Sequence, residues 1–208
     1  MRKKRVLAGA VVAVVVVGGG VYYVAGGPPF GEDATVSADQ LCEEVGTPEV
    51  AAELLNKTLP FSDSYSVDSN KTVPRVEDDD GYTTSCFVNG DDNKLLFSTV
   101  SEMWGNESVE TWRETAGVSR EFPKDQSRDF GPEGRGRVSL KSGGILMPCV
   151  PKEQSPQGQR NLDVSVRFPQ GTRIENDDAS RDAVKDVLIA VAKQSHKDAK
   201  CDLPLDLS

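Results

Sequence analysis

Four separated cysteines are the residues of this chain whose type and number most directly predict chemistry. No two of them form a Cys-x-x-Cys pair, so neither a dithiol redox motif nor a zinc knuckle is expected. An even number of separated cysteines is typical of disulfide bonding in an oxidising compartment. Sequence alone leaves the pairing open. We favour the pairing in which each disulfide joins a helix to a strand within one half of the chain: Cys42 with Cys86, and Cys149 with Cys201.

The other residue types give little support for catalysis. The single histidine, His196, falls at the end of an expected helix, where a cation interacts favourably with the helix dipole. The sequence has no Gly-x-Ser-x-Gly elbow, Walker loop or Rossmann glycine pattern. A glycosidase-like carboxylate pair stays open, because 33 acidic residues always supply some pair. We predict a non-enzymatic protein with no catalytic residues, no cofactor and no metal site.

Two further groups of residues are weaker candidates for binding. The acidic turns at 77–80 and 91–92 offer oxygen ligands for calcium, but they lack the spacing of a calcium-binding loop, and such charge runs are usually solvated. Four aromatic residues that are close in sequence would suit the rim of a pocket, although core packing is the commoner role for such side chains. They are Phe87, Phe97, Trp104 and Trp112.

The first residues have the pattern of a membrane anchor. A basic tip precedes about 20 apolar residues, the length that crosses a bilayer core, and no charged residue follows the tip until Glu32. Basic residues before the span predict a cytoplasmic N-terminus. We predict a cytoplasmic tip at residues 1–5, a single-pass transmembrane helix at 6–26, a linker at 27–36 and an extracellular domain at 37–208.

A cleaved secretory signal is the alternative for the same segment, and it would leave the domain secreted. The apolar run is longer than the core of a typical signal peptide, and an Ala-x-Ala cleavage site is missing; the nearest match is Val24-Ala25-Gly26. A lipoprotein signal is not predicted, because the first cysteine, Cys42, lies well past the apolar run. We therefore expect the chain to reach the cell membrane through an uncleaved N-terminal helix.

The exported part of the chain is strongly acidic. The whole chain has 24 basic and 33 acidic residues. The four basic residues of the tip precede the span and no acid precedes Glu32, so the exported part carries 20 minus 33, or −13. A surface of this charge repels phosphate backbones, and nucleic acid is not an expected partner.

The hydrophobic pattern of the exported part predicts an α+β fold, with an antiparallel sheet and helices packed on one face. Apolar residues at helical spacing predict three helices, at 38–56 with a break at Gly46, at 107–115 and at 178–196. Strands are predicted at 82–88 and 94–100, joined by a turn at Asn89-Gly90, and at 136–140, 145–150 and 162–168.

Two segments between these elements are predicted to be loops. Residues 57–81 are polar and irregular, and residues 117–135 are charged and rich in loop-forming residues. The second segment would divide the exported domain into two halves, at about 37–116 and 136–208. The apolar residues at 162–168 alternate strictly, so one face of that strand is expected to be buried and the other wet.

Three features in the first half of the exported part carry a family resemblance. They are Leu41-Cys42 at the start of a helix, a Val-Ala-x-x-Leu-Leu stretch at 50–55, and a second cysteine, Cys86, in a strand. In these features the chain resembles exported envelope proteins and lipoproteins of actinobacteria whose function is unknown. The lipobox cysteine of the lipoproteins is absent here. The resemblance implies a place in the cell envelope and brings no catalytic residue with it.

These observations predict a membrane-anchored extracytoplasmic domain of the binding or sensor type. Its expected partners are the membrane, through the N-terminal helix, and an envelope protein or a cell-wall ligand. The alternative is an accessory or structural subunit of a larger membrane complex of the cell envelope. For that role, Gly9 and the glycines at 18–20 would allow close packing against another membrane helix.

Overall fold

The computed structural model divides the chain into two units. The first unit contains β1 (Ala13–Val17) and β2 (Gly20–Val24), which pair with each other in antiparallel fashion. The second is a single compact unit of residues 33–208, and it carries the fold of interest. The structure describes residues 13–17, 20–24, 34–72, 81–115, 127–154 and 158–207.

The predicted membrane helix at 6–26 is not confirmed. In the part of the chain that the structure describes, no helix has both the length and the apolar character needed to cross a bilayer. The described residues of the predicted span are those of β1 and β2. The rest of the span, the tip at 1–5 and residues 27–33 of the linker lie outside the described residues. The helical anchor therefore stays a prediction.

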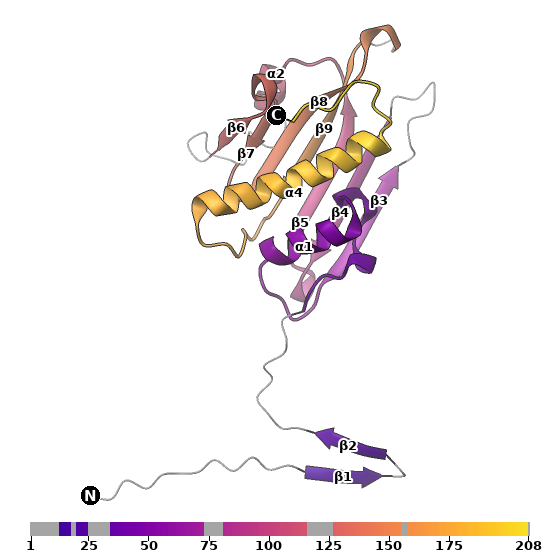
Figure 1. The fold of residues 1–208 in the computed structure, drawn as a ribbon, viewed down its shortest axis with the longest axis vertical. Helices are drawn as coiled ribbons and strands as arrows, with labels where there is room; N and C mark the ends of the chain where they lie inside the picture. The colour runs from indigo at the N-terminus through magenta and orange to yellow at the C-terminus, as the bar shows by residue number, and fades with distance from the viewer. Residues whose placement is uncertain are drawn as a thin grey trace, which may run out of the picture. The chain divides into compact units, whose positions relative to one another are not determined.

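Seven antiparallel strands form one sheet in the larger unit (Figure 1). Their order across the sheet is β3-β4-β5-β9-β8-β7-β6, so the last strand in sequence lies in the middle, between β5 and β8. The predicted α+β class with an antiparallel sheet is confirmed, and the sheet runs through both predicted halves. The strands are β3 (Ser66–Thr72), β4 (Thr83–Asn89), β5 (Leu95–Trp104), β6 (Arg128–Phe130), β7 (Gly136–Val138), β8 (Ser142–Val150) and β9 (Arg160–Arg167).

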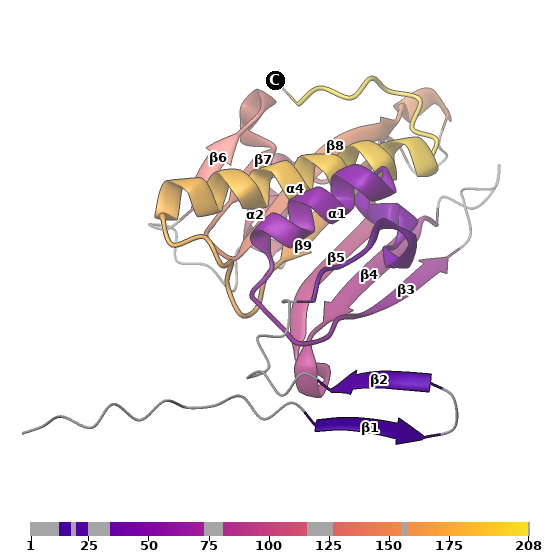
Figure 2. The same cartoon turned by 60° about the horizontal axis from the view of Figure 1, so that its bottom comes forward.

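Two helices, α1 (Pro48–Thr58) and α4 (Asp177–Asp198), pack beside each other over one face of the sheet (Figures 1 and 2). Asn176 is the N-cap of helix α4, and its side-chain oxygen accepts the backbone N–H groups of Asp178 and Ala179. Beneath the two helices lies the main hydrophobic core. The residues that α4 buries there completely are Val184, Val187, Leu188, Val191 and Ala192.

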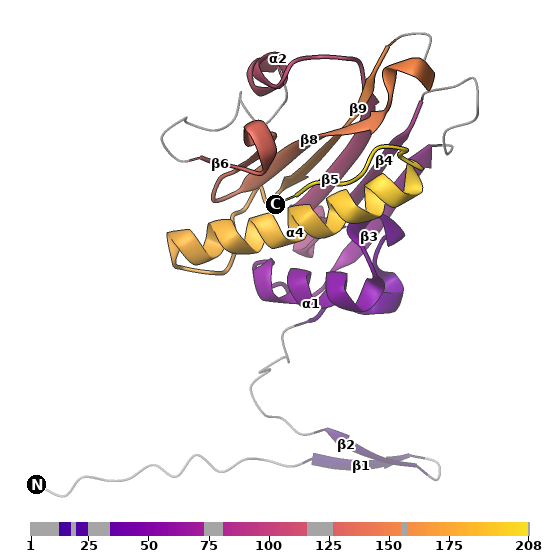
Figure 3. The same cartoon turned by 45° about the horizontal axis from the view of Figure 1, so that its top comes forward.

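A third helix, α2 (Val109–Thr115), lies on the opposite face of the sheet from α4 (Figure 3). Its Trp112 is 1% exposed and packs on Leu146 of β8. The neighbours of Leu146 along the strand, Ile145 and Met147, belong to the core beneath α4 instead. The expectation that the helices pack on one face is therefore wrong for α2, because Trp112 has a small apolar site of its own on the second face.

Two strands occupy segments that the sequence predicted to be loops. Strand β3 lies within 57–81 and β6 lies within 117–135, and they form the two edges of the sheet. The residues of β3, SVDSNKT, show no hydrophobic alternation. They are a strand because each of them pairs with a residue of β4, and strand formation depends on such pairing more than on intrinsic preference.

The predicted helix at 38–56 forms only in its second segment. Helix α1 begins at a proline, as predicted, but the residues before Gly46 form two 3-10 turns, η1 (Ala38–Gln40) and η2 (Glu43–Val45). Gly46 separates the segments with a φ of 129°, which favours glycine. A Cβ atom at this position would lie 3.7 Å from the Cβ atom of Ala190, so the break sits directly against α4.

The turn between β4 and β5 is not built as predicted. Left-handed conformations are adopted by Asp92 and Asn93, with φ of 56° and 57°, whereas Gly90 has an extended backbone. Glycine is required at position 90 for space instead. A Cβ atom there would lie 2.7 Å from both Leu96 Cδ1 and Ser62 Oγ, closer than packed atoms approach.

Two disulfides join the ends of the larger unit to its sheet, Cys42–Cys86 and Cys149–Cys201, which is the pairing favoured from the sequence. The first bond ties the segment between η1 and η2 to β4, and the second ties the tail after α4 to β8. Their sequence separations are 44 and 52 residues. Loops of this length correspond to roughly 4 kcal/mol of stabilisation each in the chain-entropy model. Two disulfides fit an oxidising, extracellular environment.

Candidate functional site

Strand β9 presents two chemically different faces to the two sides of the sheet. Leu162, Val164 and Val166 are completely buried in the core beneath α4. Successive side chains of a strand point to opposite faces, so Asp163 and Ser165 point to the second face. Among the described elements, only α2 covers part of that face, and a mixed surface over β4, β5 and β9 is left open.

A cavity of about 400 Å³ lies over this open surface. Strands β4, β5 and β9 bring its lining together from distant parts of the sequence. Two aromatic rings, two acids and one arginine line it alongside aliphatic and hydroxyl groups, a composition that suits a small-molecule site. We call it the sheet cavity, and its lining residues are Phe87, Leu95, Ser98, Val100, Glu102, Trp104, Asp163, Ser165 and Arg167.

Glu102 and Asp163 form a carboxyl pair in the sheet cavity. They lie directly opposite each other on β5 and β9, an arrangement that places Cβ atoms about 5 Å apart. Each carboxyl accepts a hydrogen bond from an indole. Trp104 Nε1 donates to Glu102 Oε1 at 2.7 Å, and Trp112 Nε1 donates to Asp163 Oδ1 at 3.0 Å. The chain has two tryptophans, and both of them bind this pair.

Burial raises the pKa of the Asp163 carboxyl from its ordinary value of 3.8 to about 7. The residue is only 8% exposed, and removal from water disfavours the charged form. The hydrogen bond from Trp112 lowers this pKa, whereas the negative charges of Glu102 and Glu107 raise it further. Among the described residues, no lysine or arginine forms an ion pair with either member of the carboxyl pair.

Helix α2 is held in place by contacts at both of its sides. Ser108 caps its first turn, and its hydroxyl accepts the backbone N–H of Thr111 at 3.1 Å. Trp112 joins the helix to the sheet, and Arg113 Nη2 donates to the carbonyl oxygen of Gly134 at 2.5 Å. A Cβ atom at position 134 would lie 1.9 Å from that nitrogen, so the contact requires glycine.

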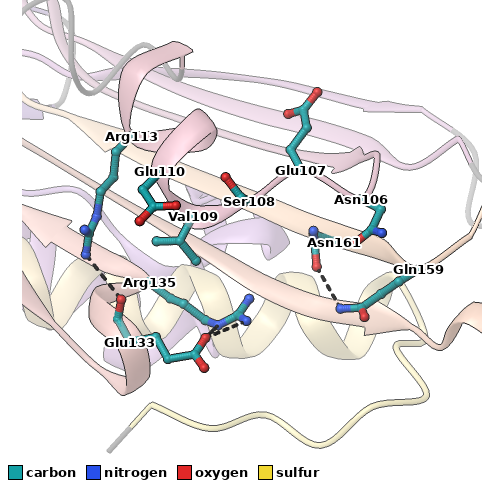
Figure 4. Close-up of a pocket in the computed structure, with 10 residues that line it drawn as sticks. All are labelled: Asn106, Glu107, Ser108, Val109, Glu110, Arg113, Glu133, Arg135, Gln159 and Asn161. Atoms are coloured by element: carbon teal, nitrogen blue, oxygen red, sulfur yellow. Dashed lines mark hydrogen bonds and ion pairs between the residues drawn. The ribbon is translucent and has the colours of Figure 1, made fainter.

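A second cavity, of about 500 Å³, lies beside α2 and is shown in Figure 4. Several of its polar side chains bond to other groups of its lining. Gln159 Nε2 donates to Asn161 Oδ1, Arg135 pairs with the Glu133 carboxylate, and Arg113 donates to the Glu133 carbonyl. We call it the α2 cavity, and it is lined by Asn106, Glu107, Ser108, Val109, Glu110, Arg113, Glu133, Arg135, Gln159 and Asn161.

The arginines of the α2 cavity and the carboxyl pair of the sheet cavity are held by different kinds of group. Both arginines of the α2 cavity are engaged with neighbouring protein groups. Within the described part of the chain, the carboxyl pair of the sheet cavity is held only by neutral indole donors. A buried acid with a shifted pKa in a cavity is a candidate for a functional group. We therefore take the sheet cavity as the candidate site.

Three of the four aromatic candidates from the sequence belong to this site. Phe87 and Trp104 line the sheet cavity, and Trp112 reaches the carboxyl pair from α2. Phe97 is the exception, because it is completely buried on the other face, with its ring centroid 5.2 Å from that of Phe168. The hypothesis of a pocket rim thus holds for two of these side chains, and core packing holds for Phe97.

Sequence reasoning missed both members of the carboxyl pair. Their approach depends on β5 lying beside β9, and these strands are separated in sequence by α2, β6, β7 and β8. One signal was available. Asp163 stands on the polar side of a strictly alternating strand, which predicts a surface acid, but nothing nearby in the sequence shows that Trp112 and Leu146 cover it.

Of the described calcium and histidine candidates, none lines the sheet cavity. The acidic turn at 77–80 lies outside the described residues. Asp91 accepts hydrogen bonds from the backbone N–H groups of 63–64, so it orders its own loop. The part of the chain that the structure describes holds no group of three or more potential metal ligands. His196 lies near the end of α4, with Nε2 2.8 Å from the carbonyl oxygen of Leu203, and contacts the C-terminal tail.

Because the pKa of Asp163 is raised in the folded chain, the free energy of unfolding should depend on pH. The folded chain keeps this proton up to about pH 7, whereas the unfolded chain loses it near 3.8. Raising the pH through that window therefore stabilises the unfolded chain, and the free energy of unfolding falls. In Asp163→Asn the side chain stays neutral and still accepts the indole hydrogen bond. We expect the stability of Asp163→Asn relative to the native chain to increase by about 3 kcal/mol between pH 5 and pH 8.

Urea unfolding of both proteins at the two pH values, followed by circular dichroism, measures this difference. Asp39→Asn, which removes an exposed carboxylate from η1, is the matched control and should show a nearly constant difference. An Asp163→Asn difference that is the same at both pH values would show that Asp163 is ionised in the folded chain.

Comparisons of the chain with known proteins found no match. No family model matches the sequence, and neither a curated protein nor a solved structure matches the chain.

Proposed function

We propose that this chain is an extracytoplasmic binding domain that takes a small ligand into the sheet cavity. The observation that carries the proposal is the contrast between the two faces of the sheet. One face is sealed by α1 and α4, whereas the other bears a cavity of about 400 Å³ with aromatic, acidic and basic groups on strands. Strands hold such side chains rigidly, which favours a preformed binding site.

The placement of the carboxyl pair supports binding more than hydrolysis. Both carboxyls arise from neighbouring strands on one side of the cavity. Two acids that cleave a glycosidic bond instead flank that bond from opposite sides. A pair on one side is suited to holding a proton or a cation between its members.

We further propose that residues 6–26 anchor the domain in the cell membrane. The apolar length and the basic tip support this, and two disulfides fit a domain on the oxidising side of that membrane. The linker at 27–36 contains two successive prolines, which favour an extended spacer between membrane and domain.

Filling the sheet cavity should abolish ligand retention. Ser165 lines the cavity between Asp163 and Arg167 along β9, so a phenyl group in Ser165→Phe would occupy the ligand's space. We expect the immobilised full chain to retain compounds from a cell-envelope extract, and Ser165→Phe to retain them at least about tenfold less, equivalent to 1.4 kcal/mol or more. Mass spectrometry of the released compounds makes the comparison.

The matched control is Gln154→Phe, which adds the same ring at an exposed position on η6 (Lys152–Gln154), away from the sheet cavity. It should retain the same compounds as the native chain, and both variants should melt like it. Equal retention by Ser165→Phe and the native chain, or no enrichment by the native chain at all, would contradict a binding role for this cavity.

The anchor is tested by the intact mass and the location of the natural protein. We expect the full chain of 208 residues to remain in the membrane fraction after an alkaline wash, because a transmembrane helix resists extraction. A soluble protein whose intact mass corresponds to a chain that starts near residue 27 would show instead that the N-terminal segment is a cleaved signal.

A further inference from the structure

We propose that the sheet cavity recognises its ligand through a primary ammonium group, which binds between the carboxyls of Glu102 and Asp163. The inference rests on the proposed binding function and adds the chemical class of the ligand. It is carried by the opposed position of the two carboxyls, by their lack of an ion-paired partner, and by the surface that continues from them along the cavity.

The carboxyl pair offers acceptors to one shared point in the cavity. Because Glu102 and Asp163 are a directly opposite pair on neighbouring strands, a group above them is within reach of both. One oxygen of each carboxyl accepts a hydrogen bond from an indole N–H. A carboxylate has about four lone-pair sites, so acceptor capacity remains on both. An ammonium group, with three N–H donors and a positive charge, matches this set.

The groups that face Asp163 are acidic or neutral, so a cationic group of the ligand would be its charge partner. From β5 it faces Glu102, and from the segment before α2 it faces Glu107; both are acids that raise its pKa. From β8 it faces the aliphatic Leu146. From α2 it faces the neutral Trp112 indole, while Arg113 of that helix is engaged at Gly134 and Asp129.

Arg167 is the one arginine or lysine in the lining of the sheet cavity. It is four residues from Asp163 along β9, which corresponds to roughly 13 Å of strand. It therefore marks the far end of the cavity and not the carboxyl pair. Between the two ends the lining is made of aliphatic, aromatic and hydroxyl side chains. The ligand therefore has its amine at one end of an uncharged body that lies over Leu95, Ser98, Val100 and Ser165.

Two other classes of cation fit this site less well. Calcium takes six to eight oxygen ligands, and the described residues provide no cluster of three potential metal ligands. A quaternary ammonium carries no N–H, so it could not bond the acceptors that the carboxyls retain. The primary amine uses both features of the pair, its charge and its acceptors.

Binding of the ammonium should release the proton that Asp163 holds. The amine enters as R–NH₃⁺, the Asp163 carboxyl loses its proton to solvent, and an ion pair forms with no other change in atoms or charge. Because binding requires the ionised form, the apparent affinity should follow the ionised fraction of Asp163. For a pKa of about 7, this fraction rises about tenfold from pH 6 to pH 8.

The test is a titration of the full chain with n-butylammonium, followed by tryptophan fluorescence, since Trp104 lines the cavity. We expect saturable binding that is about tenfold tighter at pH 8 than at pH 6. Butyltrimethylammonium, the matched cation without N–H groups, should bind at least about tenfold more weakly, and 1-butanol should not bind. Glu102→Gln and Asp163→Asn keep the indole acceptors and should each weaken binding at least about tenfold.

Glu110→Gln is the control variant, because it removes an acid from the neighbouring α2 cavity, and its binding should match that of the native chain. Absence of saturable binding, equal binding of butyltrimethylammonium, or unchanged binding by Asp163→Asn would overturn the inference. The pH dependence of the native chain needs no variant and tests the inference even where a variant fails to fold.

The two proposals fail in distinguishable ways. If n-butylammonium does not bind but Ser165→Phe still loses the envelope compounds that the native chain retains, the cavity is a binding site for another chemical class. If Ser165→Phe also retains those compounds, the binding function of the sheet cavity fails together with the inference.

Discussion

The two-faced character of β9 is the constraint on which the rest of the structure depends. This central strand must bury Leu162, Val164 and Val166 beneath α4 and, on alternate positions, place Asp163 and Ser165 on the other side. Because α1 and α4 already complete a core on the first face, the second face needs no helical layer for stability. Among the described elements it is covered only where α2 adds Trp112, and the sheet cavity lies over the remainder.

The hydrogen bond between Trp112 and Asp163 couples the position of α2 to the protonation of the carboxyl in the cavity. The indole shields most of the carboxyl from water, which raises its pKa, and at the same time donates a hydrogen bond that stabilises its charged form. A carboxylate accepts such a bond more strongly than a neutral carboxyl does, so ionisation of Asp163 strengthens the attachment of α2 while it opposes burial. The position of α2 and the protonation of the cavity are therefore linked through one side-chain pair.

Features that depend on local pattern were predictable from the sequence, and those that depend on strand order were not. Strict alternation at 162–168 predicted the two faces of β9, and the apolar stripe at 178–196 predicted α4. Strand β3 was missed because its polar residues form a strand only through pairing with β4. The carboxyl pair was missed because β5 and β9 are neighbours only in the folded sheet. The sequence showed that the aromatic residues lie close together along the chain. It did not show that Phe97 points into the core while Phe87 points into the sheet cavity, because this depends on the register of the strands.

The two tryptophans allow a direct measurement of the central claim, that a carboxyl pair bonded to both indoles, with Asp163 buried, lines the cavity. A ¹⁵N–¹H spectrum of the full chain contains two indole signals, one for each tryptophan. Our account predicts that the Trp112 signal titrates with a midpoint near pH 7 and loses this titration in Asp163→Asn. A Trp112 signal that does not change between pH 5 and pH 9 would show that its indole is not bonded to a titrating Asp163, and the account of the sheet cavity would be wrong.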